Sequence, residues 1–244
     1  MILFIILGFL GQLIDGCLGM AYGVFLTTCL MAKGVPLVYA SQSIHFSEIF
    51  TTLASGLAHW KFKNIDWQLF KKLTLPGVIG GIFGAYILTS LSGDKLKPFV
   101  SVYLLLLGIR ILLKLRKQFV FKNAHKHLIL LGTVGGFFDA IGGGGWGPIV
   151  TSSLIAKGNL PNKAIGTVNS SEFFVTLAQS ATFIILIGTG NWKIISGLII
   201  GGVLAAPVSA YLCKRINQKV LMAMVGLLIV FTNLYALYHW WGKI

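Results

Sequence analysis

The sequence predicts an all-α polytopic membrane protein, built from two homologous repeats of four hydrophobic segments each. The first observation is composition: of 244 residues, 56% are hydrophobic and 11% are charged, and the mean hydropathy is +0.84. Soluble domains carry about 25% charged residues. The second is that most apolar runs are about 20 residues long, the length that spans a bilayer. The third is that the chain resembles itself after a shift of 124 residues.

The eight hydrophobic segments define two repeats and a linker, and they leave no room for a separate soluble domain. The first repeat covers residues 1–113, a basic cytoplasmic linker covers 114–127, and the second repeat covers 128–244. In order, the segments run over residues 2–32, 36–58, 68–91, 96–114, 128–156, 161–187, 192–212 and 218–241.

The duplication is clearest in the first half of each repeat. The 124-residue shift places Asp15 on Asp139 and Glu48 on Glu172, and 15 of the 42 positions from 15 to 56 are identical to their counterparts. Unrelated hydrophobic segments would not align both acids. We therefore expect a duplicated transporter-like architecture.

Segments one and five are too long for a single span, and a glycine-rich stretch interrupts segment five. Asp139 is followed by Gly142 to Gly145, Trp146, Gly147 and Pro148. Glycine lets the backbone bend and lets a ligand approach it, and proline suits the first turn of a new half-helix. Each of the two segments is therefore either a long kinked span or a re-entrant hairpin of two half-helices. A close, glycine-lined contact between helices is the structural alternative.

The distribution of basic residues favours the re-entrant arrangement. If all eight segments cross, the loops carry 12 Lys and Arg on one side and 8 on the other; if segments one and five re-enter, the counts are 15 and 5. Because cytoplasmic loops carry the excess of Lys and Arg, the second arrangement is preferred. Each repeat then crosses three times, and the repeats are inverted relative to each other.

Four of the six acids lie inside apolar segments, as two repeat-related pairs. Glu48 and Glu172 are candidates for proton coupling, because buried acids in membranes mark ion or proton paths and burial favours the neutral carboxyl. The alternative is a neutral acid that joins neighbouring helices. Asp15 and Asp139 are expected to cap free N–H groups at the helix breaks.

Polar residues of segments two and six complete the candidate site. Ser43, His45, Asn169 and Ser170 offer hydroxyl, imidazole and amide groups to the oxygens of an anion, and Trp146 could wall the pocket. The backbone of Gly143, Gly144, Gly145 and Gly147 would add N–H groups at a positive helix end. Small polar residues also serve helix–helix contacts, so a structural role stays open.

Several other classes of function lack support. The net charge of +14 is concentrated in short loops, where it indicates orientation rather than nucleic-acid binding. Cys17, Cys29 and Cys213 form no CxxC pair, so neither a disulfide framework nor a metal site is indicated. HExxH and G-x-S-x-G motifs are absent. We expect no cofactor, no metal and no enzymatic activity.

The motifs resemble those of the sulfite exporter TauE/SafE family of permeases. The resemblance rests on Gly-Phe-Phe-Asp139-x-x-Gly-Gly-Gly-Gly, on Gly166-Thr-Val-Asn-Ser-Ser171 and on the loop at Trp192, and it extends over nearly the whole chain. It implies a plasma-membrane transporter of sulfur-containing anions such as sulfite or organosulfonates, with proton coupling. The first repeat departs from the pattern, because Cys17-Leu-Gly-Met-Ala-Tyr22 replaces most of the glycines. We therefore expect the second break to contact the substrate.

The resulting hypothesis is a proton-coupled secondary transporter that moves a small oxyanion by alternating access. Its expected partners are the anion and membrane lipid; nucleic acid is not expected, and a homodimer is left open. An anion channel, a membrane-embedded enzyme and a structural subunit are the alternatives. The particular anion, the direction of transport and the stoichiometry lie beyond the sequence.

Overall fold

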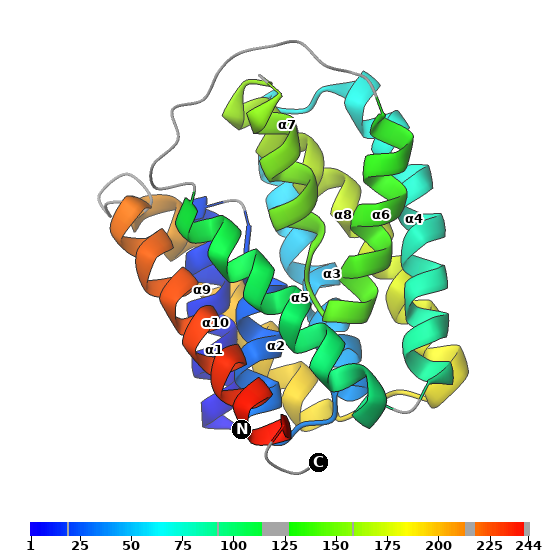
Figure 1. The fold of residues 1–244 in the computed structure, drawn as a ribbon. Helices are drawn as coiled ribbons and strands as arrows, with labels where there is room; N and C mark the ends of the chain where they lie inside the picture. The colour runs from blue at the N-terminus through cyan, green and yellow to red at the C-terminus, as the bar shows by residue number, and fades with distance from the viewer. Residues whose placement is uncertain (19, 92, 114–126, 158, 213–217, 242–244) are drawn as a thin grey trace.

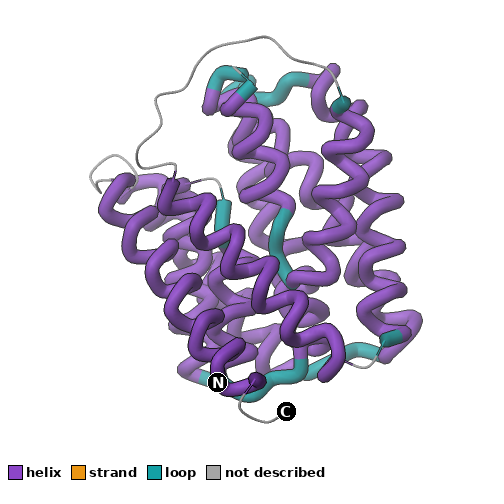
Figure 2. Tube along the Cα trace, in the orientation of Figure 1, coloured by secondary structure: helices purple, strands orange, loops and turns teal. Residues whose placement is uncertain are grey.

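The computed structural model describes residues 1–18, 20–91, 93–113, 127–157, 159–212 and 218–241. In these ranges every regular element is helical (Figures 1 and 2). The first half contains α1 (Ile2–Leu18), α2 (Tyr22–Ala32), α3 (Leu37–Lys61), α4 (Trp67–Ser90) and α5 (Gly93–Leu113). The second contains α6 (Leu128–Gly142), the π-helix η1 (Gly147–Thr151), α7 (Ser152–Ala156), α8 (Pro161–Ile187), α9 (Trp192–Leu212) and α10 (Gln218–Trp241). Some sequence-based predictions fall outside the described residues: those for residues 114–126 of the linker, for Cys213 and for the side chain of Cys17.

Segments one and five are both interrupted, as their length and glycine content predict. Between α1 and α2 the chain passes through Ala21, whose φ is 88°. Between α6 and η1 it passes through Gly143 and Gly144, with φ of 61° and 152°. A φ of 152° is open to glycine and strained for other residues. In both cases the chain then turns back: α2 returns to the end where α1 begins, and η1 and α7 return to the end where α6 begins (Figure 1).

Matched N-caps start α4 and α9. Asp66 Oδ1 accepts the backbone N–H groups of Gln68 and Leu69 at 2.9 and 3.1 Å. Asn191 Oδ1 accepts those of Lys193 and Ile194 at 3.1 and 3.4 Å. Asp and Asn are among the best N-cap residues because they satisfy N–H groups that have no partner within the helix.

Long-range packing pairs helices from opposite halves of the chain. The most extensive pairs are α1 with α9, α4 with α6, α3 with α8, α4 with α8, and α5 with α10. Glycine permits the tightest contacts: an added Cβ at Gly136 would strike the backbone of Gly77, and one at Gly201 would strike that of Ile5. Glycines therefore let α4 pack closely against α6, and α9 against α1. The centre of the molecule is made by α2, α3, α8 and the second break.

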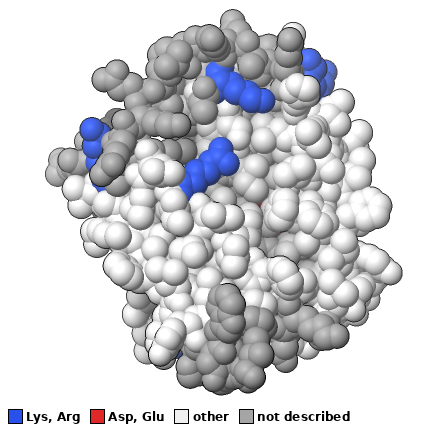
Figure 3. Space-filling view, viewed as in Figure 1, with Lys and Arg blue, Asp and Glu red and all other residues white. Residues whose placement is uncertain are grey.

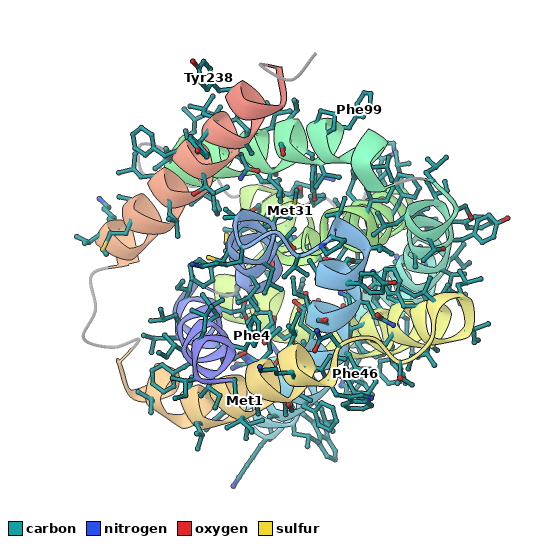
Figure 4. All side chains as sticks on the ribbon, turned by 90° about the horizontal axis from the view of Figure 1, so that it is seen from below. Met1, Phe4, Met31, Phe46, Phe99 and Tyr238 are labelled. Atoms are coloured by element: carbon teal, nitrogen blue, oxygen red, sulfur yellow. The ribbon has the colours of Figure 1, made fainter. Side chains whose placement is uncertain are left out.

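The outer surface is largely apolar. Tyr238 and Phe99 point outward from α10 and α5 and are 81% and 73% exposed (Figure 4). On the face shown in Figure 3, the described Lys and Arg side chains gather towards the end where α5 ends and α6 begins. By length and composition, α4 and residues 163–187 of α8 could each cross a bilayer. An apolar girdle of this kind fits a membrane protein.

Candidate functional site

Four acids from both halves of the chain line one small cavity at the second helix break. Asp15 comes from α1, Glu48 from α3, Asp139 from α6 and Glu172 from α8. The remaining wall is made by Ala21, Tyr22, Gly23, Val24, Thr51, Thr52, Gly144, Gly145, Gly147 and Pro148. The free space is about 10 Å³, roughly what the centre of one water molecule requires. This conformation is therefore closed around the acids.

Asp139 caps the start of the second half-helix. Its Oδ1 accepts the backbone N–H groups of Gly145 at 2.7 Å and Trp146 at 2.9 Å. Its Oδ2 accepts the side-chain amide of Gln179 at 3.0 Å. These are the contacts that the capping interpretation expects. They also mean that two of the N–H groups assigned to an anion are bonded to a carboxylate in this conformation.

Asp15 makes the equivalent contact at the first break. It accepts a hydrogen bond from the backbone N–H of Tyr22, seven residues further on, as Trp146 is from Asp139. The Tyr22 hydroxyl lies 3.0 Å from that of Ser47. Tyr22 and Trp146 coincide under the 124-residue shift, so the backbone contact follows the duplication. The residues that bond the two aromatic side chains differ.

His45 joins Glu48 to the second break. The imidazole is fully buried; its Nδ1 lies 3.0 Å from Glu48 Oε2 and its Nε2 lies 3.2 Å from the carbonyl oxygen of Asp139. A carbonyl can only accept, so Nε2 carries a hydrogen. The contact between Nδ1 and the carboxyl then needs one further proton, held on either group. The pair therefore provides a place for a proton beside the acid cavity.

Side chains of the first repeat also donate hydrogen bonds to the C-terminal end of α6. Thr27 donates to the carbonyl of Gly143 at 2.7 Å, and Ser41 donates to that of Ala140 at 2.5 Å. The last carbonyls of a helix lack partners within it, so these two bonds and that of His45 stabilise the break. The five residues from Gly143 to Gly147 are buried.

The remaining predicted residues are distributed around this centre. Trp146 places its ring outside the cavity, in a core cluster against Val150 and over Gly77, and its Nε1 donates to the carbonyl of Val168 at 3.2 Å. Asn169 donates to Ser55 at 2.8 Å. Ser170 donates to the carbonyl of Gly166 at 2.7 Å. None of these side chains lines the acid cavity, so their substrate-binding roles stay predictions.

Ser43 is buried and its hydroxyl has no hydrogen-bond partner. It too lies outside the cavity lining, and its predicted role in binding is untested.

Sequence reasoning missed several residues that build the site. Thr27, Ser41 and Gln179 bond the second break directly, and Thr51 and Thr52 line the cavity. Polar residues inside apolar helices were the available signal, but their partners lie far away in the sequence, in the other repeat for Thr27 and Ser41 and 40 residues away for Gln179. Within the described ranges, no group of three or more His, Cys, Asp and Glu is arranged to hold a metal ion.

Comparison with known proteins agrees with the family that the motifs resemble. The family model of the sulfite exporter TauE/SafE matches residues 4–236. The chain is 42% identical over 251 aligned positions to the Bacillus subtilis (strain 168) protein named "Probable membrane transporter protein YtnM", covering 99% of this chain and 84% of that one. It is 18% identical to "Probable membrane transporter protein YunE" of the same organism, over 98% of this chain and 97% of that one. No solved structure matches. The chain therefore belongs to the sulfite exporter TauE/SafE family of membrane transporters.

Proposed function

We propose that the protein is a proton-coupled secondary transporter that moves a small sulfur-containing oxyanion, of the sulfite or organosulfonate class, across the plasma membrane by alternating access. The observation that carries this proposal is the meeting of four acids, two from each repeat, at the glycine-rich helix break; Glu48 and Asp139 are buried, and Asp15 and Glu172 are half-buried. The family supports transport. The residues around the break support the coupling.

Electrostatics links the anion to protons at this site. Among the described residues that line the cavity there is no Lys or Arg. Two unit charges of like sign 4 Å apart repel by about 4 kcal/mol at an effective dielectric constant of 20. An anion can therefore enter beside these carboxyls only when they carry protons. Proton binding then precedes or accompanies anion binding, which is the physical requirement for coupled movement.

Release of the cap would expose the binding groups. In the closed conformation, Asp139 occupies the N–H groups of Gly145 and Trp146. Protonation of Asp139 weakens these charge-assisted bonds and leaves the N–H groups to an oxyanion. The same proton thus removes the repulsive charge and frees the donors.

The arrangement of the repeats supports alternating access. Exchanging the two repeats turns the contact between α1 and α9 into the contact between α6 and α4. The same exchange turns the α3–α8 and α5–α10 contacts into themselves. The two hairpins also enter from opposite ends of the molecule (Figure 1). We infer inverted repeats that each cross the membrane three times, a design in which one repeat moves against the other. The positive-inside rule places the linker end in the cytoplasm.

The test is flux in proteoliposomes. Glu172→Gln keeps the shape of the side chain and imitates its protonated form, so we expect sulfite to bind while flux driven by a pH gradient is lost. Binding is followed by thermal shift in detergent. Glu48→Gln is expected to behave in the same way.

Asp66→Asn is the matched control, because Asn191 already serves as the cap at the equivalent position. It should transport like the wild type. Flux in Glu172→Gln that still follows the pH gradient would exclude the coupling role. Currents without saturation in planar bilayers would favour an anion channel instead.

A further inference from the structure

A second, larger cavity lies at the end of the molecule that holds both termini. Its volume is about 870 Å³. It opens between the loop that joins α2 to α3 and the loop that joins α8 to α9. The residues that line it are Lys33, Gly34, Val35, Pro36, Tyr39, Ile187, Gly190, Asn191, Trp192, Lys193 and Ile194. It shares no lining residue with the acid cavity.

The lining of this cavity is positively charged. Lys33, at the end of α2, and Lys193, in the first turn of α9, lie on opposite sides of it, and both are exposed. No Asp or Glu is among its lining residues. Tyr39, Asn191 and Trp192 add polar atoms and flat aromatic surface. A hollow lined by charges of one sign concentrates small ions of the opposite sign.

A line of side chains on α3 leads from this cavity to the acids. Tyr39, Gln42, His45 and Glu48 follow one another at three-residue steps, so each is a neighbour of the next and the line winds around α3 from its exposed start into the core. Gln42 is 1% exposed; its Nε2 donates to the carbonyl of Gly188 at 2.5 Å, and its Oε1 has no partner. Gly190 packs against that amide. Gln42 therefore lies between Gly190, which lines the cavity, and the His45–Glu48 pair further along α3.

At the opposite end of the molecule, the elements equivalent to those around this cavity are held together by hydrogen bonds. There the backbone N–H of Asp66 donates to the Thr167 hydroxyl at 2.8 Å, and Lys163 Nζ donates to the carbonyl of Lys63 at 2.6 Å. These contacts tie the start of α8 to the loop between α3 and α4. Trp67 and Trp192 start equivalent helices, yet the charged cavity is found beside Trp192.

We infer that the cavity between Lys33 and Lys193 is a loading vestibule that gathers small oxyanions before they reach the acid cavity. The inference rests on the proposed function. Since the positive-inside rule places the linker in the cytoplasm, the vestibule faces the outside. Its lysines concentrate the anion, and the step past Gln42 delivers it to the protonated site.

The experiment compares sulfite flux in the wild type and in the double variant Lys33→Gln/Lys193→Gln. We expect the variant to raise KM about tenfold at low salt, the lower end of known electrostatic steering effects, while the maximal rate is kept. This difference in KM between wild type and variant should be largest at about 0.01 M salt and absent at about 1 M, because the Debye length falls from about 30 Å to about 3 Å. Lys71→Gln/Lys72→Gln, which removes two exposed lysines from the other end, is the control.

An unchanged KM in the double variant, or an equal rise in the control, would overturn the vestibule and leave the transport proposal standing. A second measurement does not need transport. Iodide quenches tryptophan fluorescence, and the signal of Trp192 is the difference between wild type and Trp192→Phe. If iodide quenches the Trp192 signal more strongly in the wild type than in the lysine double variant, the vestibule is supported even if sulfite is not carried. Equal quenching in both would also overturn it.

Discussion

The two helix breaks begin from equivalent positions and end with different structures. At each one an Asp accepts the N–H of an aromatic residue seven positions on, Tyr22 from Asp15 and Trp146 from Asp139. Beyond that, Asp139 also bonds Gly145 and Gln179. Side chains of the first repeat bond the carbonyls at the end of α6.

The difference shows how a duplicated chain can divide its work. The second repeat has more glycines at its break, and Gly143 and Gly144 let the backbone there contact Gly23 of the first repeat. The first repeat supplies the polar groups of α2 and α3 that hold this backbone in place. Among the described residues, the glycine-rich break therefore makes more hydrogen bonds to side chains than the first break does, although glycine alone favours flexibility.

The largest effect should come from closing the contact between the two breaks. In Gly144→Ala, the new methyl group would overlap the backbone of Gly23 and Val24, at a φ of 152° that alanine tolerates poorly. We expect a loss of more than about 4 kcal/mol, enough to prevent recovery of folded protein.

Gly34→Ala is its control, because Gly34 also has a positive φ, of 80°, with nothing within 4 Å of the added carbon. It should cost only about 1 kcal/mol. Size-exclusion profiles and melting temperatures in detergent measure both. Similar melting temperatures for the two variants would show that the breaks do not pack as described.

The next effect should separate the two capping acids. Asp139→Asn turns one acceptor towards the Gln179 amide into a donor, and it weakens two bonds to backbone N–H groups. We expect a cost of about 2 kcal/mol, which corresponds to a melting temperature about 4–8 °C lower. Among the described residues, Asp15 makes one such bond, to Tyr22, so Asp15→Asn should cost about half as much. Equal shifts would mean that the two caps are equivalent after all.

Much of the chain's organisation could be predicted from local pattern. The predicted segment 161–187 coincides with α8, and 68–91 is offset by one residue from α4. Both breaks could be placed because a long apolar run with internal glycines cannot be one straight span. The acids could be paired between repeats because the 124-residue shift is an alignment within one sequence.

The contents of the site depended on packing and were harder to predict. His45 and Glu48 are three residues apart on one helix, a spacing that brings side chains together, yet His45 was assigned to the anion alone. Trp146 was expected at a pocket wall, but Gly77 and Gly135 leave the space that its ring fills in the core. These contacts join distant parts of the chain, and the spacing within one segment does not encode them.

The smallest effect should separate the equivalent residues Thr27 and Thr151. Both are fully buried, but Thr27 donates to the carbonyl of Gly143, whereas the Thr151 hydroxyl has no partner. Valine has nearly the same shape as threonine and lacks the hydroxyl. Thr27→Val leaves a buried carbonyl short of a donor, at a cost of about 1 kcal/mol, whereas Thr151→Val removes an unsatisfied polar group and should be neutral or stabilising. Melting temperatures that fall for Thr27→Val and hold or rise for Thr151→Val would show that the duplicated threonine acts at the second break alone. If the melting temperature falls as much for Thr151→Val as for Thr27→Val, the Thr151 hydroxyl must also have a hydrogen-bond partner, which would contradict this prediction.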